Sequence, residues 1–128
     1  MGSVRAQTTI DRPAQEVWAE IGDFRCLDWI PDIVAFRLQG ETTRLVSVHG
    51  MDLVERLTSS DDEARTYTYS VQGLPVEQHS ATLTVTPQNE VRSLVTWDTT
   101  TDDHMAGMLR DGCQIVLDQL QARLGTAP

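Results

Sequence analysis

The longest periodic pattern of apolar residues lies at the C-terminal end of the chain, between Asp102 and Leu124. With a turn of about 100° per residue, one row of small and apolar side chains falls on a single face and further apolar residues flank it. The row is Met105, Leu109, Gly112, Val116 and Leu120, and the flanking residues are Met108, Cys113, Ile115, Leu117 and Leu124. Thr101 or Asp102 can cap the start, and Gly125 ends the pattern. The pattern predicts one long helix whose wide apolar stripe needs a large covering surface.

The rest of the chain consists mainly of short runs in which apolar and polar residues alternate, which is typical of strands. The first run is Ser3–Ile10. Six more follow, separated by residues that favour turns: Ile33–Gln39, Thr43–Val48, Asp52–Ser59, Thr66–Gln72, Gln78–Thr86 and Val91–Thr99. The connections between these six runs are too short for a crossover, so neighbouring strands must pair antiparallel.

Two short helices are predicted between the first and second strands. Pro13 suits the first position of a helix, and an apolar face at helical spacing follows it: Ala14, Val17, Trp18 and Ile21. The segment Asp23–Trp29 is the second predicted helix, and it ends before Pro31 because the residue preceding a proline avoids the helical region. The chain of 128 residues is therefore expected to form a single domain, 1–128.

Seven short motifs stand out along this order of elements: Thr9–Trp18, Ile21–Phe24, Trp29–Pro31, Val54–Leu57, Tyr67–Tyr69, Leu74–Val76 and Val95–Trp97. Together they resemble the polyketide cyclase/dehydrase-like branch of the START-like (Bet v 1-like, SRPBCC) superfamily. The resemblance implies an α+β helix-grip fold, in which a curved seven-stranded antiparallel sheet surrounds a long C-terminal helix and leaves a cavity. Members of this superfamily include aromatase/cyclase enzymes and carriers of lipids or hormones, so the fold does not settle the function.

Strand alternation identifies the side chains that would face such a cavity. The inward positions are mostly apolar with a few polar groups, the usual make-up of a small-molecule site. The sheet supplies Glu55, Tyr67, Tyr69, His79 and Trp97. Trp29 lies at the expected mouth, and the helix supplies Met105, Met108, Leu109 and Gly112.

Glu55 and His79 are the candidates for acid–base chemistry. Glu55 shares a face with two leucines, where loss of hydration favours the protonated acid and suits proton transfer. The alternative is that Glu55 pairs with a buried arginine or reaches the open rim. The resemblance implies an aromatic residue near position 79, so His79 is a departure. It could act with Glu55 as a general acid or base, or be an inert strand histidine.

Other members of the predicted lining also have two interpretations. Tyr69 and Tyr67 could donate hydrogen bonds to a carbonyl or an enolate, or simply pack in the core. Trp29 and Trp97 could stack on a ligand or pack. Gly112 costs about 1 kcal/mol relative to alanine inside a helix, which would be compensated either by room for a ligand or by close approach of the sheet. Met105 and Met108 would form an adaptable wall.

Composition excludes several classes of function. A formal net charge of −9 argues against nucleic acid and against anionic membranes as partners. The two cysteines, Cys26 and Cys113, fall in predicted helices and are expected to be buried, reduced thiols of a cytoplasmic protein. Scattered histidines and the lack of nucleotide-binding motifs predict no metal and no cofactor.

These observations lead to three hypotheses. The first is a cofactor-independent cyclase or dehydratase for a hydrophobic, carbonyl-rich, polyketide-like molecule, with Glu55 and His79 moving protons and Tyr69 polarising a carbonyl. The second is a non-catalytic carrier of a lipid-like or aromatic ligand. The third is a protein-binding role for a domain whose cavity is small and filled.

Overall fold

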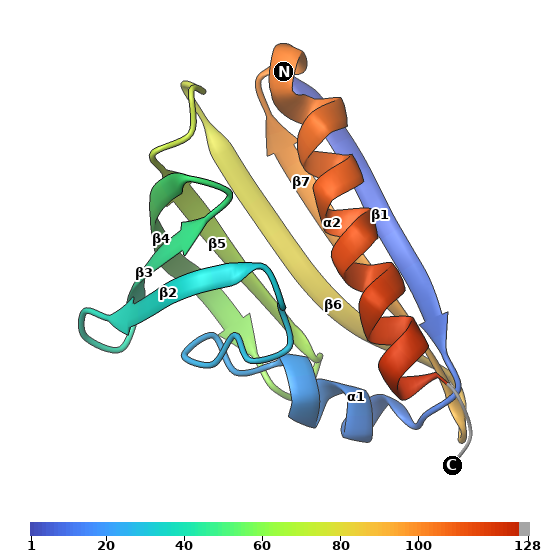
Figure 1. Ribbon diagram of the computed structural model, residues 1–128. Helices are drawn as coiled ribbons and strands as arrows, with labels where there is room; N and C mark the ends of the chain where they lie inside the picture. Colours follow the sequence, from blue (N-terminus) through green and yellow to red (C-terminus); the bar gives the residue numbers. More distant parts are fainter. Residues whose placement is uncertain (126–128) are drawn as a thin grey trace.

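The computed structural model describes residues 1–125. It contains seven strands and two helices (Figure 1): β1 Gly2–Ile10, α1 Ala14–Ile21, β2 Ile33–Leu38, β3 Thr43–Val48, β4 Met51–Asp61, β5 Thr66–Gln72, β6 His79–Asn89, β7 Arg92–Thr101 and α2 Asp103–Leu124. The strands form one antiparallel sheet in the order β1-β7-β6-β5-β4-β3-β2. The predicted α+β helix-grip fold is confirmed.

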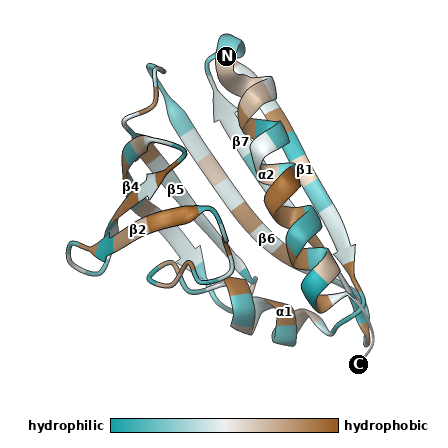
Figure 2. Cartoon of the chain, viewed as in Figure 1, coloured by the Kyte–Doolittle hydropathy of each residue, from teal (hydrophilic) through white to brown (hydrophobic). Residues whose placement is uncertain are grey.

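The sheet is strongly curved, and its two ends have different neighbours on the concave side. Helix α2 packs against β1 and β7, whereas β2, β3 and β4 curl round toward it from the other end (Figure 1). Hydrophobic and hydrophilic residues alternate along β1 and β6 (Figure 2), as expected for strands with one face turned inward. One side of α2 therefore packs on β1 and β7, and another side faces β2, β3 and β4 (Figure 1).

The predicted second helix at Asp23–Trp29 is wrong, and this segment is a series of turns. Its backbone makes only single-turn bonds, from Cys26 N to the Asp23 carbonyl at 3.0 Å and from Ile30 N to the Leu27 carbonyl at 3.0 Å. The Asp23 carboxylate also accepts from Arg25 N at 2.9 Å, a local bond that competes with helix formation. Cys26 therefore lies in a turn, and both cysteines are free and half-buried.

Helix α1 closes one end of the molecule, where it packs on β6 and β7. Its buried face is the predicted one: Ala14, Val17, Trp18 and Ile21. Pro13 is the N-cap, one position before the predicted place. Gly22 ends the helix by donating to the Trp18 carbonyl at 2.8 Å, and a Cβ there would come within 2.4 Å of the Trp18 ring. This approach requires glycine.

The apolar stripe of α2 is only partly covered by the sheet. The side chains that pack into the core are Ala106, Leu117 and Leu120, whereas Met108 and Ile115 are 68% and 55% exposed. The reason is tertiary, because α2 rests on β1 and β7 along one side only. The row that contains Gly112 consequently faces the space enclosed by the curved sheet.

Polar side chains fix the position of α2. Gln114 accepts from Gln7 N at 3.1 Å and donates to the Gln7 carbonyl at 2.9 Å, so its amide pairs with the backbone of edge strand β1. Asp102 is the N-cap of α2, but its carboxylate does not cap the helix. It accepts instead from Glu77 N at 2.9 Å and Gln78 N at 3.3 Å, which fastens the β5–β6 loop to the start of α2.

Candidate ligand-binding cavity

A cavity of about 380 Å³ lies between the concave face of the sheet and α2. Its wall is mostly apolar and comes from the turn segment before β2, from strands β2 to β7, and from α2. All ten candidate residues from the sequence line it: Glu55, Tyr67, Tyr69, His79, Trp97, Trp29, Met105, Met108, Leu109 and Gly112. The fold therefore brings together side chains from both ends of the chain.

Gly112 lies where α2 faces this cavity. A Cβ added at Gly112 would meet no atom within 4 Å, so close approach of the sheet does not explain the glycine. Of the two interpretations that the sequence left open, only the one based on free space agrees with the structure. Gly112 therefore borders open space at the edge of the cavity, although glycine has poor helical propensity.

Glu55 forms a buried ion pair with Arg44. Arg44 Nε lies 2.6 Å from Glu55 Oε1, and Arg44 NH1 donates to the Phe24 carbonyl at 2.7 Å. The guanidinium also lies over the Phe24 ring, 4.0 Å from its centroid. Burial opposes the charge on Arg44, but Glu55 offsets it and the pKa of the guanidinium is raised. This is the arginine pairing that the sequence left as an alternative for Glu55.

Arg44 itself was missed in the sequence analysis, although two signals point to it. It alternates with Val46 and Val48 in β3, which places it on the apolar face of that strand. The antiparallel register then sets Arg44 directly opposite Glu55. A basic residue across from an acidic one, both on apolar faces, indicates a buried pair.

His79 stands apart from Glu55. Its ring lies beside Tyr69, with centroids 6.2 Å apart, and the described residues contain no hydrogen bond or ion pair between His79 and Glu55. His79 Nδ1 is buried and has no hydrogen-bond partner within residues 1–125. Burial lowers the pKa of His79, so the imidazole is neutral at physiological pH.

The two tyrosines of the cavity wall are hydrogen-bond donors. Burial raises the pKa of Tyr67, and burial together with Glu55 raises that of Tyr69 well above the usual value, so both phenols stay protonated. The Tyr69 hydroxyl accepts from Trp97 Nε1 at 3.0 Å. Because the hydroxyl oxygen is the acceptor in that bond, its own hydrogen can be donated to a ligand.

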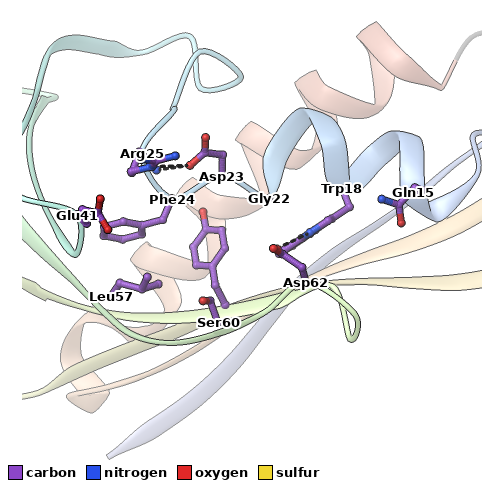
Figure 3. A pocket seen from close by; sticks show the side chains of 11 residues that line it. Gln15, Trp18, Gly22, Asp23, Phe24, Arg25, Glu41, Leu57, Ser60 and Asp62 are labelled. Carbon is purple, nitrogen blue, oxygen red and sulfur yellow. Dashed lines mark hydrogen bonds and ion pairs between the residues drawn. The ribbon is translucent and has the colours of Figure 1, made fainter.

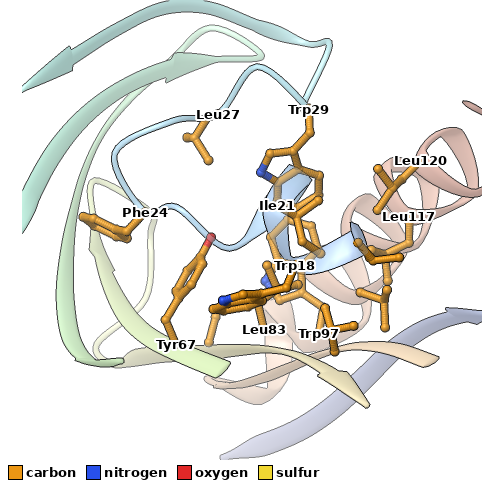
Figure 4. Packing of buried hydrophobic residues seen from close by; sticks show 14 of the residues in the cluster. Trp18, Ile21, Phe24, Leu27, Trp29, Tyr67, Leu83, Trp97, Leu117 and Leu120 are labelled. Atoms are coloured by element: carbon orange, nitrogen blue, oxygen red, sulfur yellow. The ribbon is translucent and has the colours of Figure 1, made fainter. Parts of the chain in front are cut away.

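Trp29 completes the aromatic part of the wall (Figure 4). Its ring packs on Trp97 with centroids 5.5 Å apart, and the side chain is only 4% exposed. In Figure 4 the indole nitrogen of Trp29 points to the side on which Leu27 and Phe24 lie. That nitrogen has no hydrogen-bond partner among the residues that the structure describes.

Cys113 also lines the cavity but is not a nucleophile. Burial, with a further contribution from Glu55, raises the pKa of its thiol to about 12. The thiolate is the reactive form of cysteine, so Cys113 is inert near neutral pH.

A second hollow, of about 510 Å³, lies outside the cavity between α1 and the β4–β5 hairpin (Figure 3). Two pairs of its polar side chains bond to each other. Trp18 Nε1 donates to Asp62 at 3.2 Å, and Arg25 Nε lies 3.6 Å from an Asp23 oxygen. None of the unpartnered buried polar atoms of residues 1–125 lies in its wall. The cavity is therefore the better candidate site.

Two further findings concern cofactors and membranes. Residues 1–125 contain no group of three or more His, Cys, Asp and Glu side chains placed to hold a metal ion. Within the same range, neither helix has the length and apolar character needed to span a bilayer.

Known proteins share this fold and this sequence pattern. The chain matches the family described as polyketide cyclase / dehydrase and lipid transport over residues 1–125. The protein XoxI from Bacillus cereus is 29% identical, with a TM-score of 0.90 over 97% of this chain and 96% of that one. An uncharacterized protein from Bacillus thuringiensis is 28% identical, with a TM-score of 0.89 over 96% of this chain and 98% of that one.

A more distant structure has the same fold. The di-domain ARO/CYC BexL from the BE-7585A biosynthetic pathway is 18% identical, with a TM-score of 0.76 over 100% of this chain and 48% of that one. No curated protein matches the chain. Since the family match extends over all the described residues, the protein belongs to the polyketide cyclase / dehydrase and lipid transport family.

Proposed function

We propose that this protein binds a hydrophobic small molecule in the cavity between α2 and the sheet. The observation that carries the proposal is the open, mostly apolar volume of about 380 Å³ between the curved sheet and α2. An apolar wall with a few polar groups is the usual setting for such a ligand. The family description, which includes lipid transport, supports the same conclusion.

Filling the cavity tests this proposal, and α2 supplies a matched control. Gly107 also has nothing within 4 Å of an added Cβ, but it does not line the cavity. The probe is 6-propionyl-2-(dimethylamino)naphthalene, an uncharged aromatic ketone whose fluorescence responds to an apolar environment. We expect Gly112→Leu to weaken probe binding about tenfold or more, the equivalent of roughly 1.4 kcal/mol, and Gly107→Leu to leave it unchanged. Equal binding by both variants would contradict the proposal.

A second candidate function is cofactor-independent cyclisation of a carbonyl-rich, polyketide-like ligand. It is favoured by the neutral imidazole of His79, which lines the cavity next to Tyr69. His79 would take a proton from the carbon between two carbonyls while Tyr69 donates to the enolate oxygen. The enolate carbon would attack a second carbonyl of the same molecule, and the resulting alkoxide would recover the proton from His79. Glu55 would act indirectly, by holding Arg44.

The carrier and the enzyme are distinguished by the fate of a reactive ligand. A synthetic poly-β-ketone thioester is incubated with the protein, and the products are analysed by mass spectrometry. A cyclase gives the cyclised product or its dehydrated form faster than the buffer control, and His79→Gln removes the acceleration while still binding the naphthyl ketone. A carrier returns the thioester unchanged.

The protein-binding role expected for a filled cavity has no support here. It assumes that side chains occupy the interior, whereas the structure has an open volume of about 380 Å³. Ligand binding therefore accounts for the cavity better than a role confined to the outer surface.

A further inference from the structure

The polar atoms of the cavity wall differ in whether they are accessible. Trp29 Nε1 and His79 Nδ1 have no partner in residues 1–125 and are themselves buried, so neither atom can reach a ligand as the wall stands. The paired side chains of Arg44 and Glu55 line the same cavity. Each of them has a further polar atom that is neither bonded nor buried, as the next two paragraphs show.

Arg44 uses only part of its capacity to donate hydrogen bonds. Of its five N–H donors, the one on Nε goes to Glu55 Oε1 at 2.6 Å and one on NH1 goes to the Phe24 carbonyl at 2.7 Å. NH2 donates no hydrogen bond within residues 1–125, and it is not one of the buried unpartnered atoms of that range. Burial raises the pKa of Tyr67 and the nearby Arg44 opposes this, but the Tyr67 hydroxyl can engage only one of the two NH2 hydrogens. Since Arg44 is 2% exposed and lines the cavity, the accessible surface of NH2 faces the cavity.

Glu55 likewise has one oxygen that is open. Oε1 accepts from Arg44, whereas Oε2 accepts no hydrogen bond in the described part of the chain and is not among its buried unpartnered atoms. The charge of Glu55 also acts on residues around the cavity. After burial, Glu55 is the next cause that raises the pKa of Tyr69 on β5 and of Cys113 on α2. Because Cys113 belongs to the helix that faces the sheet, the carboxylate lies toward the space between them.

The two open atoms are close together. NH2 shares a carbon with Nε, Oε2 shares a carbon with Oε1, and Nε and Oε1 are 2.6 Å apart. The ion pair therefore presents a donor and an acceptor at one place in a mostly apolar wall. A buried ion pair offsets its loss of hydration only when its remaining hydrogens and lone pairs are also bonded. A ligand that displaces water from this place without replacing these bonds loses affinity.

We propose that the Arg44–Glu55 pair is the polar anchor of the cavity and recognises a hydroxyl group on an otherwise apolar ligand. The hydroxyl oxygen accepts from Arg44 NH2, and the hydroxyl hydrogen is donated to Glu55 Oε2. A hydroxyl supplies both functions in one uncharged group, which suits a pair whose own charges cancel. The inference rests on the proposed binding function and adds the chemical class of the ligand and the two residues that select it.

Three naphthalene probes of similar size test the two bonds. 2-Naphthol can accept and donate, 2-methoxynaphthalene can only accept, and 2-methylnaphthalene can do neither. Their affinities are measured by displacement of the naphthyl ketone at about pH 7.5, where a phenol is uncharged. Because the probes differ in their transfer from water, the quantity compared between proteins is the ratio of naphthol affinity to methylnaphthalene affinity.

The double variant Arg44→Met/Glu55→Leu removes the anchor without leaving an unpaired buried charge. We expect the ratio to fall at least tenfold in this variant, which corresponds to the loss of hydrogen bonds to charged groups. The matched control is Arg5→Met/Asp98→Leu. Arg5 and Asp98 also face each other on neighbouring strands, 2.6 Å apart, but neither lines the cavity, so the control should keep the ratio of the unaltered protein.

The outcomes separate this inference from the proposed function. An unchanged ratio in the folded double variant refutes the anchor, while the cavity remains a binding site. Methoxynaphthalene keeps only the bond from Arg44, so its own ratio to methylnaphthalene should fall less than that of naphthol. Equal falls refute the bond to Glu55 and with it the preference for a hydroxyl. If none of the probes binds to the unaltered protein, the inference and the proposed function are both refuted.

A measurement on the unaltered protein covers the case in which the double variant does not fold. NMR of the arginine Nε–H groups reports on the anchor directly. The Arg44 signal should move further with naphthol than with methylnaphthalene, because the two probes share a ring system and differ in the hydroxyl. The Arg5 signal is the internal reference and should stay in place. Equal movement of the Arg44 signal with both probes would contradict a hydroxyl bound at this pair.

Discussion

Arg44 and Glu55 lie opposite one another on β3 and β4, with Arg44 Nε 2.6 Å from Glu55 Oε1, inside the wall of the cavity. The side chain of Arg44 is only 2% exposed and that of Glu55 only 11%. Removing one partner of a buried pair leaves the other charge uncompensated, which costs far more than the pair contributes in net terms. The role of Glu55 that this structure supports is to balance the buried charge of Arg44.

We therefore predict that Glu55→Gln lowers the free energy of unfolding by about 3 kcal/mol. The double variant Arg44→Met/Glu55→Leu, which removes both charges, should be markedly more stable than Glu55→Gln alone. Urea denaturation followed by circular dichroism measures both. A Glu55→Gln protein within about 0.5 kcal/mol of the unaltered protein, the range of ordinary surface changes, would show that the carboxylate is not needed to balance Arg44.

Gly112→Ala should stabilise the protein by about 1 kcal/mol, because alanine is the better helix former and its methyl group meets no neighbour. Gly107→Ala is the control, since Gly107 has equal space on the same helix, and it should give a similar gain. Thermal unfolding measures both changes. A loss of stability for Gly112→Ala alone would indicate a contact at this position.

Stability should depend on pH through His79. Burial lowers its pKa from the usual value of about 6.5, so between the two pKa values the unfolded chain binds more protons than the folded one. Above about pH 6.5 His79 is neutral in both states and does not reduce the free energy of unfolding. As the pH falls below 6.5 toward the folded-state pKa, protonation of His79 in the unfolded chain lowers the free energy of unfolding.

The measurement compares urea denaturation of the protein and of His79→Gln at about pH 7.5 and about pH 5.5. The protein should lose more stability than the variant between these conditions. Contributions from other groups are common to both proteins and cancel in the difference. Equal losses would mean that His79 titrates as it does in the unfolded chain.

Cys113 should resist alkylation. Its thiol has a pKa of about 12, so little thiolate is present at about pH 8, where an ordinary cysteine is substantially ionised. In a Cys26→Ser background, the reaction of the remaining thiol with a disulfide reagent should be at least tenfold slower in the folded protein than in denaturant. Comparable rates in the folded and denatured protein would show that the fold does not protect the Cys113 thiol.

Local patterns in the sequence were sufficient for most of the fold and for much of the site. Period-two alternation located seven strands, because all of them except β2 have one face turned inward. The same parity identified the cavity-facing side chains of the sheet. Period 3.6 located α2. The turn segment Asp23–Trp29 was misread because its spacing resembles a helix, while its actual conformation depends on burying Phe24, Leu27 and Trp29 under the curved sheet.

The tertiary structure decided how these parts meet. Strand alternation placed Glu55 and His79 on inward faces, because alternation reflects burial, and Trp29 was expected at the mouth of the cavity. Strand register paired Glu55 with Arg44, and the packing of the interior left one nitrogen each of His79 and Trp29 without a partner in residues 1–125. Because α2 packs on β1 and β7, Gly112 faces open space. Local periodicity encodes which face of an element is apolar, whereas the partner of each polar atom is set by contacts between residues distant in the chain.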